Sequence, residues 1–146
     1  MFDKNTLLSE IMSSPVITVR TQDNMTVVKD IFSQNNIHHI PVLDRYNRVA
    51  GIISTSDYHK VLHSLTLFKS AQSEAYNQAV LKSLLVEDVM ARQLATLNTN
   101  DTIATAAAYF KENLFHAIPV MDQHGKLAGI VTTFDLLSFA FKDSSA

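Results

Sequence analysis

The chain has 146 residues, and 12 Lys and Arg stand against 14 Asp and Glu, so the formal net charge is -2 at pH 7. Because 47% of its residues are hydrophobic and 18% are charged, the chain can form a buried core. It lacks the excess of basic residues that nucleic-acid binding requires. The absence of Cys excludes disulfides and thiolate sites, and because we find neither a leader pattern nor an apolar run of ~18 residues, we expect a cytoplasmic protein without membrane contact.

The first predicted elements are a strand and a helix. Residues 16–19 form a short β-branched run that is typical of a strand. Asp23 then offers an N-cap for a helix with one apolar side, which we expect to face the core. That side consists of Met25, Val28, Ile31 and Phe32.

A hairpin and a second helix are predicted next. Two apolar runs, residues 40–43 and 49–53, flank a stretch rich in turn residues at 44–48, which favours antiparallel strands. Thr55 is placed to cap a closing helix that begins near residue 56. The predicted order of elements is β-α-β-β-α.

The stretch from residue 59 to 85 contains neither Gly nor Pro and has a predominantly helical pattern. As one helix it would extend about 40 Å at 1.5 Å per residue. A break at residues 70–73 would instead give two shorter helices, and the sequence leaves both possibilities open.

The rest of the chain repeats the first part without gaps, at an offset of 78 residues. Between Ser9 and Tyr58, 16 of 50 positions are identical to their partners, where about three would match by chance in unrelated sequences. Asp101 takes the place of Asp23 before a second helix, and Thr133 takes the place of Thr55. The second apolar helix side is Ile103, Ala106, Ala107 and Phe110.

Residues 51–57 and 129–135 share one design, a glycine and an apolar strand followed by a hydroxyl residue and an aspartate in the first turn of a helix. A helix start attracts anions, and a carboxylate there can accept hydrogen bonds from two vicinal hydroxyls, such as those of a ribose. The same residues also form ordinary helix caps. Two matched copies favour a binding role over simple capping.

These motifs resemble a tandem pair of CBS domains, often called a Bateman module. The resemblance is carried by matched segments in each half, namely residues 11–12, 18, 38–44 and 51–57 with residues 89–90, 96, 116–122 and 129–135. It implies a mixed α+β (α/β) fold of two β-α-β-β-α repeats packed about a pseudo-twofold axis. The repeats would span residues 7–58 and 86–141, joined by the helical linker 59–85.

The resemblance further implies a regulatory module that binds adenine nucleotides (AMP, ADP or ATP) in clefts between the repeats. Asp57 and Asp135 would bind ribose, Ser54 and Thr132 would lie near phosphate, and basic residues would reach phosphate from the other repeat. His38 and His39 would thus face a ligand held by Asp135, and His116 one held by Asp57, where Ala117 replaces the second basic residue. The full expected set is Thr18, His38, His39, Ile40, Pro41, Ser54, Asp57, Thr96, His116, Ile118, Pro119, Thr132 and Asp135.

Two other readings remain open, a sensor of S-adenosylmethionine or another nucleoside, and a structural interaction module with empty clefts. We expect no catalysis, no required cofactor and no metal site, since His59 and His63 are four residues apart without a third ligand nearby. The resemblance also implies a regulated partner protein and a homodimer. The expected apolar dimer surface is Val61, Leu62, Leu65, Leu137, Phe139 and Phe141.

Overall fold

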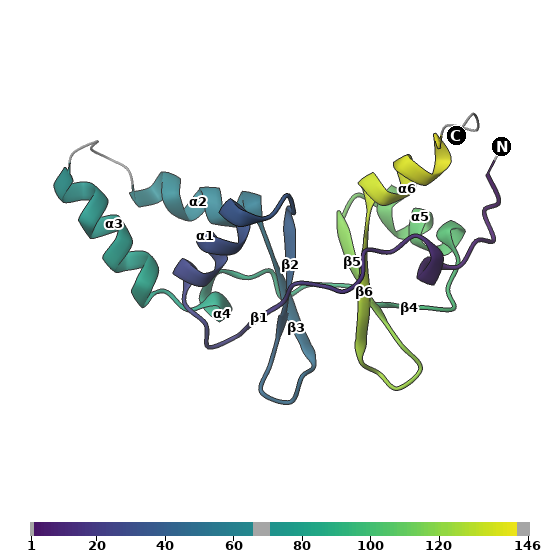
Figure 1. The fold of residues 1–146 in the computed structure, drawn as a ribbon, viewed down its shortest axis with the longest axis horizontal. Coiled ribbons are helices and arrows are strands. Elements are labelled where there is room, and N and C mark those ends of the chain that lie inside the picture. Colours follow the sequence, from purple (N-terminus) through teal and green to yellow (C-terminus); the bar gives the residue numbers. More distant parts are fainter. Residues whose placement is uncertain (1, 66–70, 143–146) are drawn as a thin grey trace. The chain divides into compact units, whose positions relative to one another are not determined.

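The computed structural model describes residues 2–65 and 71–142, with the side chains of 65 and 71–73 excepted. The chain forms two compact units. The first unit is Ile17–Gln93, and the second unit combines Met1–Val16 with Leu94–Ala146. In each unit the helices lie on one face of a three-stranded sheet (Figure 1). The predicted mixed α+β fold is confirmed.

The first unit has the sheet order β1-β2-β3, with β1 parallel to β2 and β2 antiparallel to β3. Strand β1 has two residues, shorter than the predicted 16–19. The elements are β1 (Val19–Arg20), α1 (Met25–Gln34), β2 (His39–Leu43), β3 (Val49–Ser54), α2 (Thr55–Leu65), α3 (Ala71–Ser83) and α4 (Val86–Val89).

The second unit repeats this topology in the order β4-β5-β6. A short 3-10 helix, η1, takes the place that α4 has in the first unit. The elements are η1 (Leu8–Glu10), β4 (Leu97–Asn98), α5 (Ile103–Lys111), β5 (Ala117–Met121), β6 (Leu127–Thr132) and α6 (Thr133–Ala140). The predicted order β-α-β-β-α is therefore confirmed twice.

The predicted N-caps of α1 and α5 are wrong by one residue. The side chain of Asn24 caps α1, and that of Thr102 caps α5. The Asp23 carboxylate instead accepts a hydrogen bond from the Arg20 N–H at 2.8 Å, and Asp101 accepts one from the Asn98 N–H at 2.7 Å. Both aspartates thus stabilise the turn before the helix rather than the helix start.

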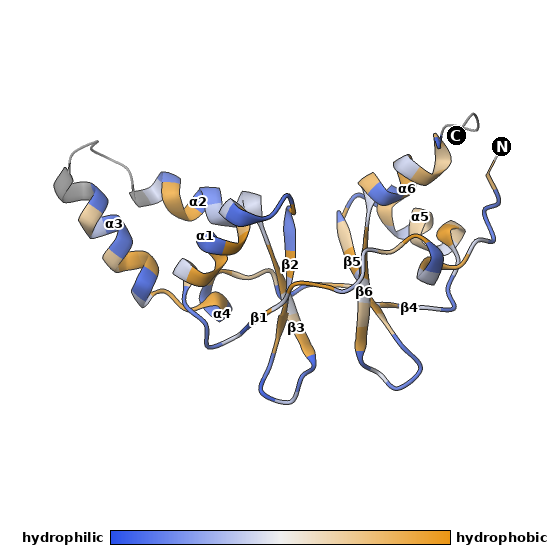
Figure 2. Cartoon of the chain, in the orientation of Figure 1, coloured by the Kyte–Doolittle hydropathy of each residue, from blue (hydrophilic) through white to orange (hydrophobic). Residues whose placement is uncertain are grey.

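The hairpin turns, which are polar while the strands are apolar (Figure 2), are held by aspartates. Asp44 Oδ1 accepts hydrogen bonds from the N–H groups of Tyr46 and Arg48 at 2.8 and 3.0 Å. The bond from Arg48 N–H is the main cause that lowers the pKa of Asp44, and the Lys126 N–H lowers the pKa of Asp122 in the same way. The predicted hairpins are confirmed.

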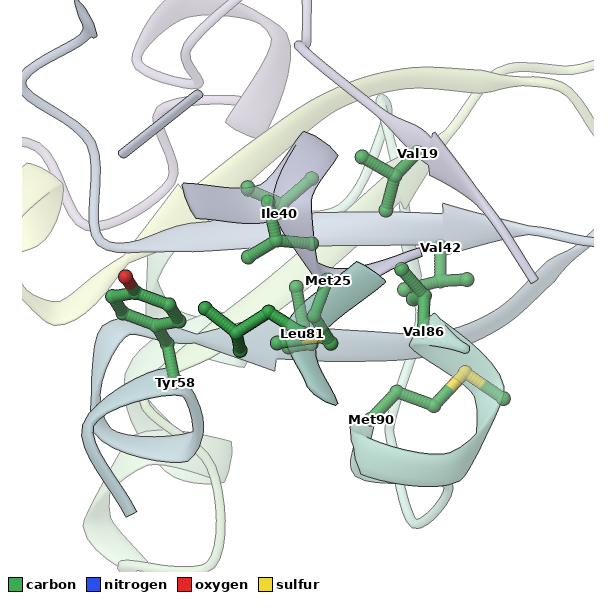
Figure 3. Packing of buried hydrophobic residues seen from close by; sticks show 10 residues of the cluster. Val19, Met25, Ile40, Val42, Tyr58, Leu81, Val86 and Met90 are labelled. Atoms are coloured by element: carbon green, nitrogen blue, oxygen red, sulfur yellow. The ribbon is translucent and has the colours of Figure 1, made fainter. Parts of the chain in front are cut away.

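The linker contains two helices in its described part, α2 and α3. Both contact α1. Leu81 of α3 is 3% exposed and points into the same core as Ile40 and Tyr58 (Figure 3). Of the linker, residues 66–70 lie outside the described part.

In each unit the sheet also pairs with a segment that the sequence assigns to the other repeat. In the first unit Ala91 exchanges two backbone hydrogen bonds with Ile52, and in the second unit Ser13 does the same with Ile130, at 2.9 to 3.1 Å. The segments pass so close to the strands that a Cβ on Gly51 would lie 2.6 Å from the Ala91 carbonyl oxygen. A Cβ on Gly129 would lie 2.9 Å from that of Ser13. Glycine is therefore required at both positions by close backbone approach.

The residues of the expected dimer surface differ in exposure. Val61, Leu62 and Phe139 are partly buried and pack against the cores of their own units. Leu137 and Phe141 are exposed, and the side chain of Leu65 lies outside the described residues. None of the described helices has the length and apolar character needed to cross a membrane.

Candidate functional site

In the first unit the motif lies where β3 passes directly into α2. Ser54 Oγ accepts a hydrogen bond from the Asp57 N–H at 3.1 Å, and Asp57 Oδ2 accepts from the Ser54 N–H at 2.9 Å. Ser54 Oγ also donates to Asp57 Oδ2 at 2.9 Å. The two residues form a capping box, so α2 begins at Thr55 and is capped by Ser54, not by Thr55 as predicted.

The second unit has the same capping box between β6 and α6. Thr132 Oγ1 accepts from the Asp135 N–H at 3.2 Å, and Asp135 Oδ2 accepts from the Thr132 N–H at 2.9 Å. The cap is again one residue earlier than the predicted Thr133. Both motifs thus form ordinary helix caps, as the sequence also allows.

Capping does not use the whole carboxylate. Asp57 and Asp135 are half-buried, and in the described part of the chain neither Oδ1 atom receives a hydrogen bond. In each aspartate the cap fixes Oδ2, and Oδ1 is therefore held at the helix start, where the helix dipole is positive. Each junction can therefore offer a fixed acceptor to hydroxyl groups without losing its cap.

The expected histidines lie beside the motif of their own unit. His38 is exposed, and its carbonyl accepts a hydrogen bond from the Thr55 N–H at 3.0 Å; His116 is also exposed and accepts one from the Thr133 N–H at 3.4 Å. His39 opens β2 opposite Ser54, and Ala117 opens β5 opposite Thr132. Sequence reasoning missed this adjacency, although antiparallel pairing around the predicted hairpin implies it.

The remaining expected residues differ in exposure. Ile40, Pro41, Ile118 and Pro119 are buried at the centres of β2 and β5, so their side chains belong to the strands' packing. Thr18 is half-buried before β1, and Thr96 is exposed before β4.

Helix α2 carries two further groups of titratable side chains. His59 and His63 line an open depression of about 590 Å³ on α2, and the described residues contain no group of three potential metal ligands. Tyr58, next to Asp57, packs in the core beside Phe32. Burial, assisted by the negative charge of Asp30, raises the pKa of the Tyr58 hydroxyl.

Comparison with known proteins identifies the family to which the chain belongs. The sequence pattern of the CBS domain matches residues 8–64 and 86–142. The chain is 31% identical to the uncharacterized protein MJ1426 of Methanocaldococcus jannaschii, over 90% of this chain and 89% of that protein. It is 26% identical to an L-aspartate semialdehyde sulfurtransferase of the same organism, over 90% of this chain but only 22% of that enzyme.

Solved structures agree in fold. The CBS domain of a membrane protein from Sphaerobacter thermophilus has a TM-score of 0.80 at 26% identity, covering 93% of this chain and 88% of that one. The CBS pair of protein MJ0100, solved with 5'-methylthioadenosine and S-adenosyl-L-methionine, has a TM-score of 0.73 at 24% identity, covering 94% and 98%. CBSX2, solved with AMP, has a TM-score of 0.73 at 19% identity, covering 94% and 97%. The chain belongs to the CBS domain family and contains a pair of these domains, which generally act as regulatory modules.

Proposed function

We propose that this CBS pair is a regulatory module that binds an adenine nucleotide, AMP, ADP or ATP, and performs no catalysis of its own. The observation that carries the proposal is the duplicated junction, in which a half-buried aspartate caps a helix with Oδ2 and keeps Oδ1 available. Capping alone needs no such duplication, because many residue types cap helices.

In the proposed complex Asp57 and Asp135 accept hydrogen bonds from the two ribose hydroxyls. Ser54 Oγ and Thr132 Oγ1 lie at the helix starts, where the positive end of the dipole favours phosphate. His38, His39 and His116 contribute donors and, when protonated, positive charge. The other proposed contacts are Thr18, Ile40, Pro41, Thr96, Ile118 and Pro119, with the buried strand residues presenting their backbone.

The ligand class is supported by chemistry that two relatives share. CBSX2 was solved with AMP and the MJ0100 pair with S-adenosyl-L-methionine and 5'-methylthioadenosine, all of which contain adenosine. AMP carries a phosphate group, whereas S-adenosyl-L-methionine and 5'-methylthioadenosine carry none. Ala117, which cannot contact phosphate with its side chain, favours S-adenosylmethionine or another phosphate-poor nucleoside as the second candidate.

A thermal-shift panel tests the proposal. A ligand that binds only the folded state adds RT ln(1 + [L]/Kd), about 2.7 kcal/mol at a hundredfold excess over Kd. We expect stabilisation by AMP, ADP and ATP, little by GMP, and an affinity that rises with phosphate number. Preference for S-adenosylmethionine would favour the second candidate, and no shift with any adenosine compound would leave a structural interaction module.

We further propose that the module forms a homodimer through the exposed apolar residues Phe134 and Leu137 of α6 and Phe141 at its C-cap, and that it signals to a separate partner. Exposed apolar patches usually mark contacts. Light scattering should find a mass near twice 16.3 kDa, and Phe134→Ser with Phe141→Ser should reduce it to the monomer. A wild-type monomer at micromolar concentration would contradict the dimer.

A further inference from the structure

Three of the four arginines in the sequence gather at the turn between β2 and β3. The guanidinium carbons of Arg45 and Arg48 lie 4.9 and 5.0 Å from the centre of the Tyr46 ring. Arg20 reaches the same turn from β1, where its Nη1 donates a hydrogen bond to the Asp44 carbonyl at 2.9 Å. We call Arg20, Arg45, Tyr46 and Arg48 the arginine cluster, and all four residues are exposed.

Asp44 holds the cluster in place and balances only part of its charge. Its Oδ1 accepts the N–H groups of Tyr46 and Arg48, and its Oδ2 accepts the Arg48 Nε at 3.1 Å. Asp23, in the turn after β1, accepts the backbone N–H of Arg20. The pair of Arg48 with Asp44 is the sole salt bridge in the part of the chain that the structure describes. The turn therefore presents more positive than negative charge.

The second unit shows that the turn does not need these arginines. Asp122 accepts the N–H groups of His124 and Lys126 at 2.8 and 2.9 Å, as Asp44 does in the first unit. At the offset of 78 residues, the cluster is replaced by Asn98, Gln123, His124 and Lys126. The hydrogen bonds of the turn are repeated while its arginines and its aromatic ring are not, which favours a role of the cluster in binding.

The chemistry of the cluster fits carboxylates of another protein. Guanidinium groups bind carboxylates through paired hydrogen bonds, and Tyr and Arg are enriched at the energetic centres of protein interfaces. Among the described residues, Arg45 donates no side-chain hydrogen bond and Arg48 uses only its Nε. Nucleic acid is a poorer occupant, because three arginines neutralise few phosphates and the whole chain has a net charge of -2.

We propose that the arginine cluster binds an acidic segment of a partner protein, in which at least two carboxylates pair with Arg45 and Arg48 beside the exposed ring of Tyr46. The turn lies at the end of β3 opposite Ser54, roughly 17 Å away at ~3.3 Å per residue (Figure 1). It shares no residue with the candidate ligand site or with the proposed dimer surface. The inference takes from the proposed function only that the module has a separate partner, and binding itself needs no nucleotide.

An NMR titration of the full chain, without nucleotide and at low salt, tests the proposal with two unstructured peptides. One peptide alternates Glu with Gly, and the other alternates Lys with Gly. The glutamate peptide should shift the amides of Tyr46, Asn47 and Arg48 in a saturable manner, and the lysine peptide should not. Salt at roughly 0.3 M should weaken the binding, because it screens exposed charges.

Two variants that change the net charge equally provide the contrast. Arg45→Gln gives the first turn the residue found in the second turn, and it should weaken binding of the glutamate peptide roughly twofold to fivefold, as for the loss of an exposed ion pair. Adding Tyr46→His to it should weaken the binding further. Lys126→Gln is the matched control in the second turn and should leave the binding unchanged. The replaced side chains are exposed, so all variants should keep the fold.

Equal weakening by Arg45→Gln and Lys126→Gln would reveal a mere effect of net charge and overturn the proposal. The same amide shifts with inorganic phosphate at equal charge concentration would also overturn it, in favour of a general anion site. Tighter binding of a single-stranded oligonucleotide would favour nucleic acid instead, and amides of the turn that shift with protein concentration alone would favour a second copy. None of these results changes the expected stabilisation by AMP, so failure of this inference is distinguishable from failure of the proposed function.

Discussion

The two units share their strand-to-helix junctions and differ on their helices. In both units a glycine lies where a second backbone segment passes close to the strand, and a capping box begins the helix that follows the strand. The exposed residues along one side of α2, however, are Ser56, His59 and His63, whereas the equivalent residues in the second unit are Phe134 and Leu137 of α6 and Phe141 at its C-cap. The duplicated parts are those that place the candidate ligand site, and the divergent parts are surfaces that can meet other molecules.

Helix α3 is the largest difference, and Leu81→Ala removes its anchor. Because Leu81 is almost fully buried, the substitution should cost about 2–5 kcal/mol of stability through lost burial and a cavity. Asp3→Ala, at the equivalent position of the second unit, should change stability by less than about 0.5 kcal/mol. Urea denaturation of both variants checks the contrast, and similar losses would show that the two positions are equivalent after all.

The glycines sharpen what the units share. Gly51→Ala and Gly129→Ala should each cost about 1–3 kcal/mol, because the new Cβ meets a backbone oxygen that moves only with its segment. Gly125→Asn serves as control, since the equivalent Asn47 already adopts a φ of 64° and a Cβ at Gly125 meets nothing within 4 Å. Thermal unfolding should separate the two classes; an equally harmful Gly125→Asn would remove the argument from close approach.

The capping boxes should contribute equally. Ser54→Ala and Thr132→Ala each remove the acceptor of an aspartate N–H and should each cost about 1 kcal/mol. Chemical denaturation of the two single variants and the double variant provides the measurement. A loss in only one unit would mean that the junctions are not equivalent.

The smallest expected effect is the acid response of the hairpin turns. The pKa values of Asp44 and Asp122 are lowered in the fold, below the 3.8 of an ordinary Asp. Their stabilisation is therefore present above pH 3.8 and is lost as the pH falls through the lower folded pKa. Asp44→Asn and Asp122→Asn should make stability less dependent on pH below 4, to a small and similar extent in both units. An unchanged acid profile would contradict the role of these turns.

Local chemistry was enough to predict the hairpins and the duplicated order of elements. Turn residues such as Asp44 act within a few positions, and the apolar runs beside them alternate as strands do. The caps were missed by one residue because Asp23 and Asn24 are both good capping residues. Only the turn that Asp23 closes with Arg20 leaves the cap to Asn24.

The completion of the units depends on contacts between distant parts of the chain. Nothing near Met12 or Ser13 indicates that Ser13 pairs with Ile130, and the burial of Leu81 follows from α1, which is distant in sequence. The offset of 78 residues between the repeats did indicate one of these relations. It extends back to Lys4 and Leu7, which match Lys82 and Leu85, and this extension relates the start of the chain to the end of α3. The sequence predicted which residues form the candidate site. Only the structure shows that, among the described residues, the Oδ1 atoms of Asp57 and Asp135 receive no hydrogen bond.

Calorimetry with AMP on Asp57→Asn, Asp135→Asn and the double variant tests the central claim most directly. The amide oxygen of Asn can still accept the Ser54 or Thr132 N–H, so the caps and the fold are largely kept, while the charge that receives ribose hydroxyls is removed. Losing charged hydrogen bonds of about 1.5–3 kcal/mol should weaken each site roughly tenfold to a hundredfold. Each single variant should lose one site, and the double variant both; an AMP affinity unchanged in the double variant would show that these aspartates only cap helices.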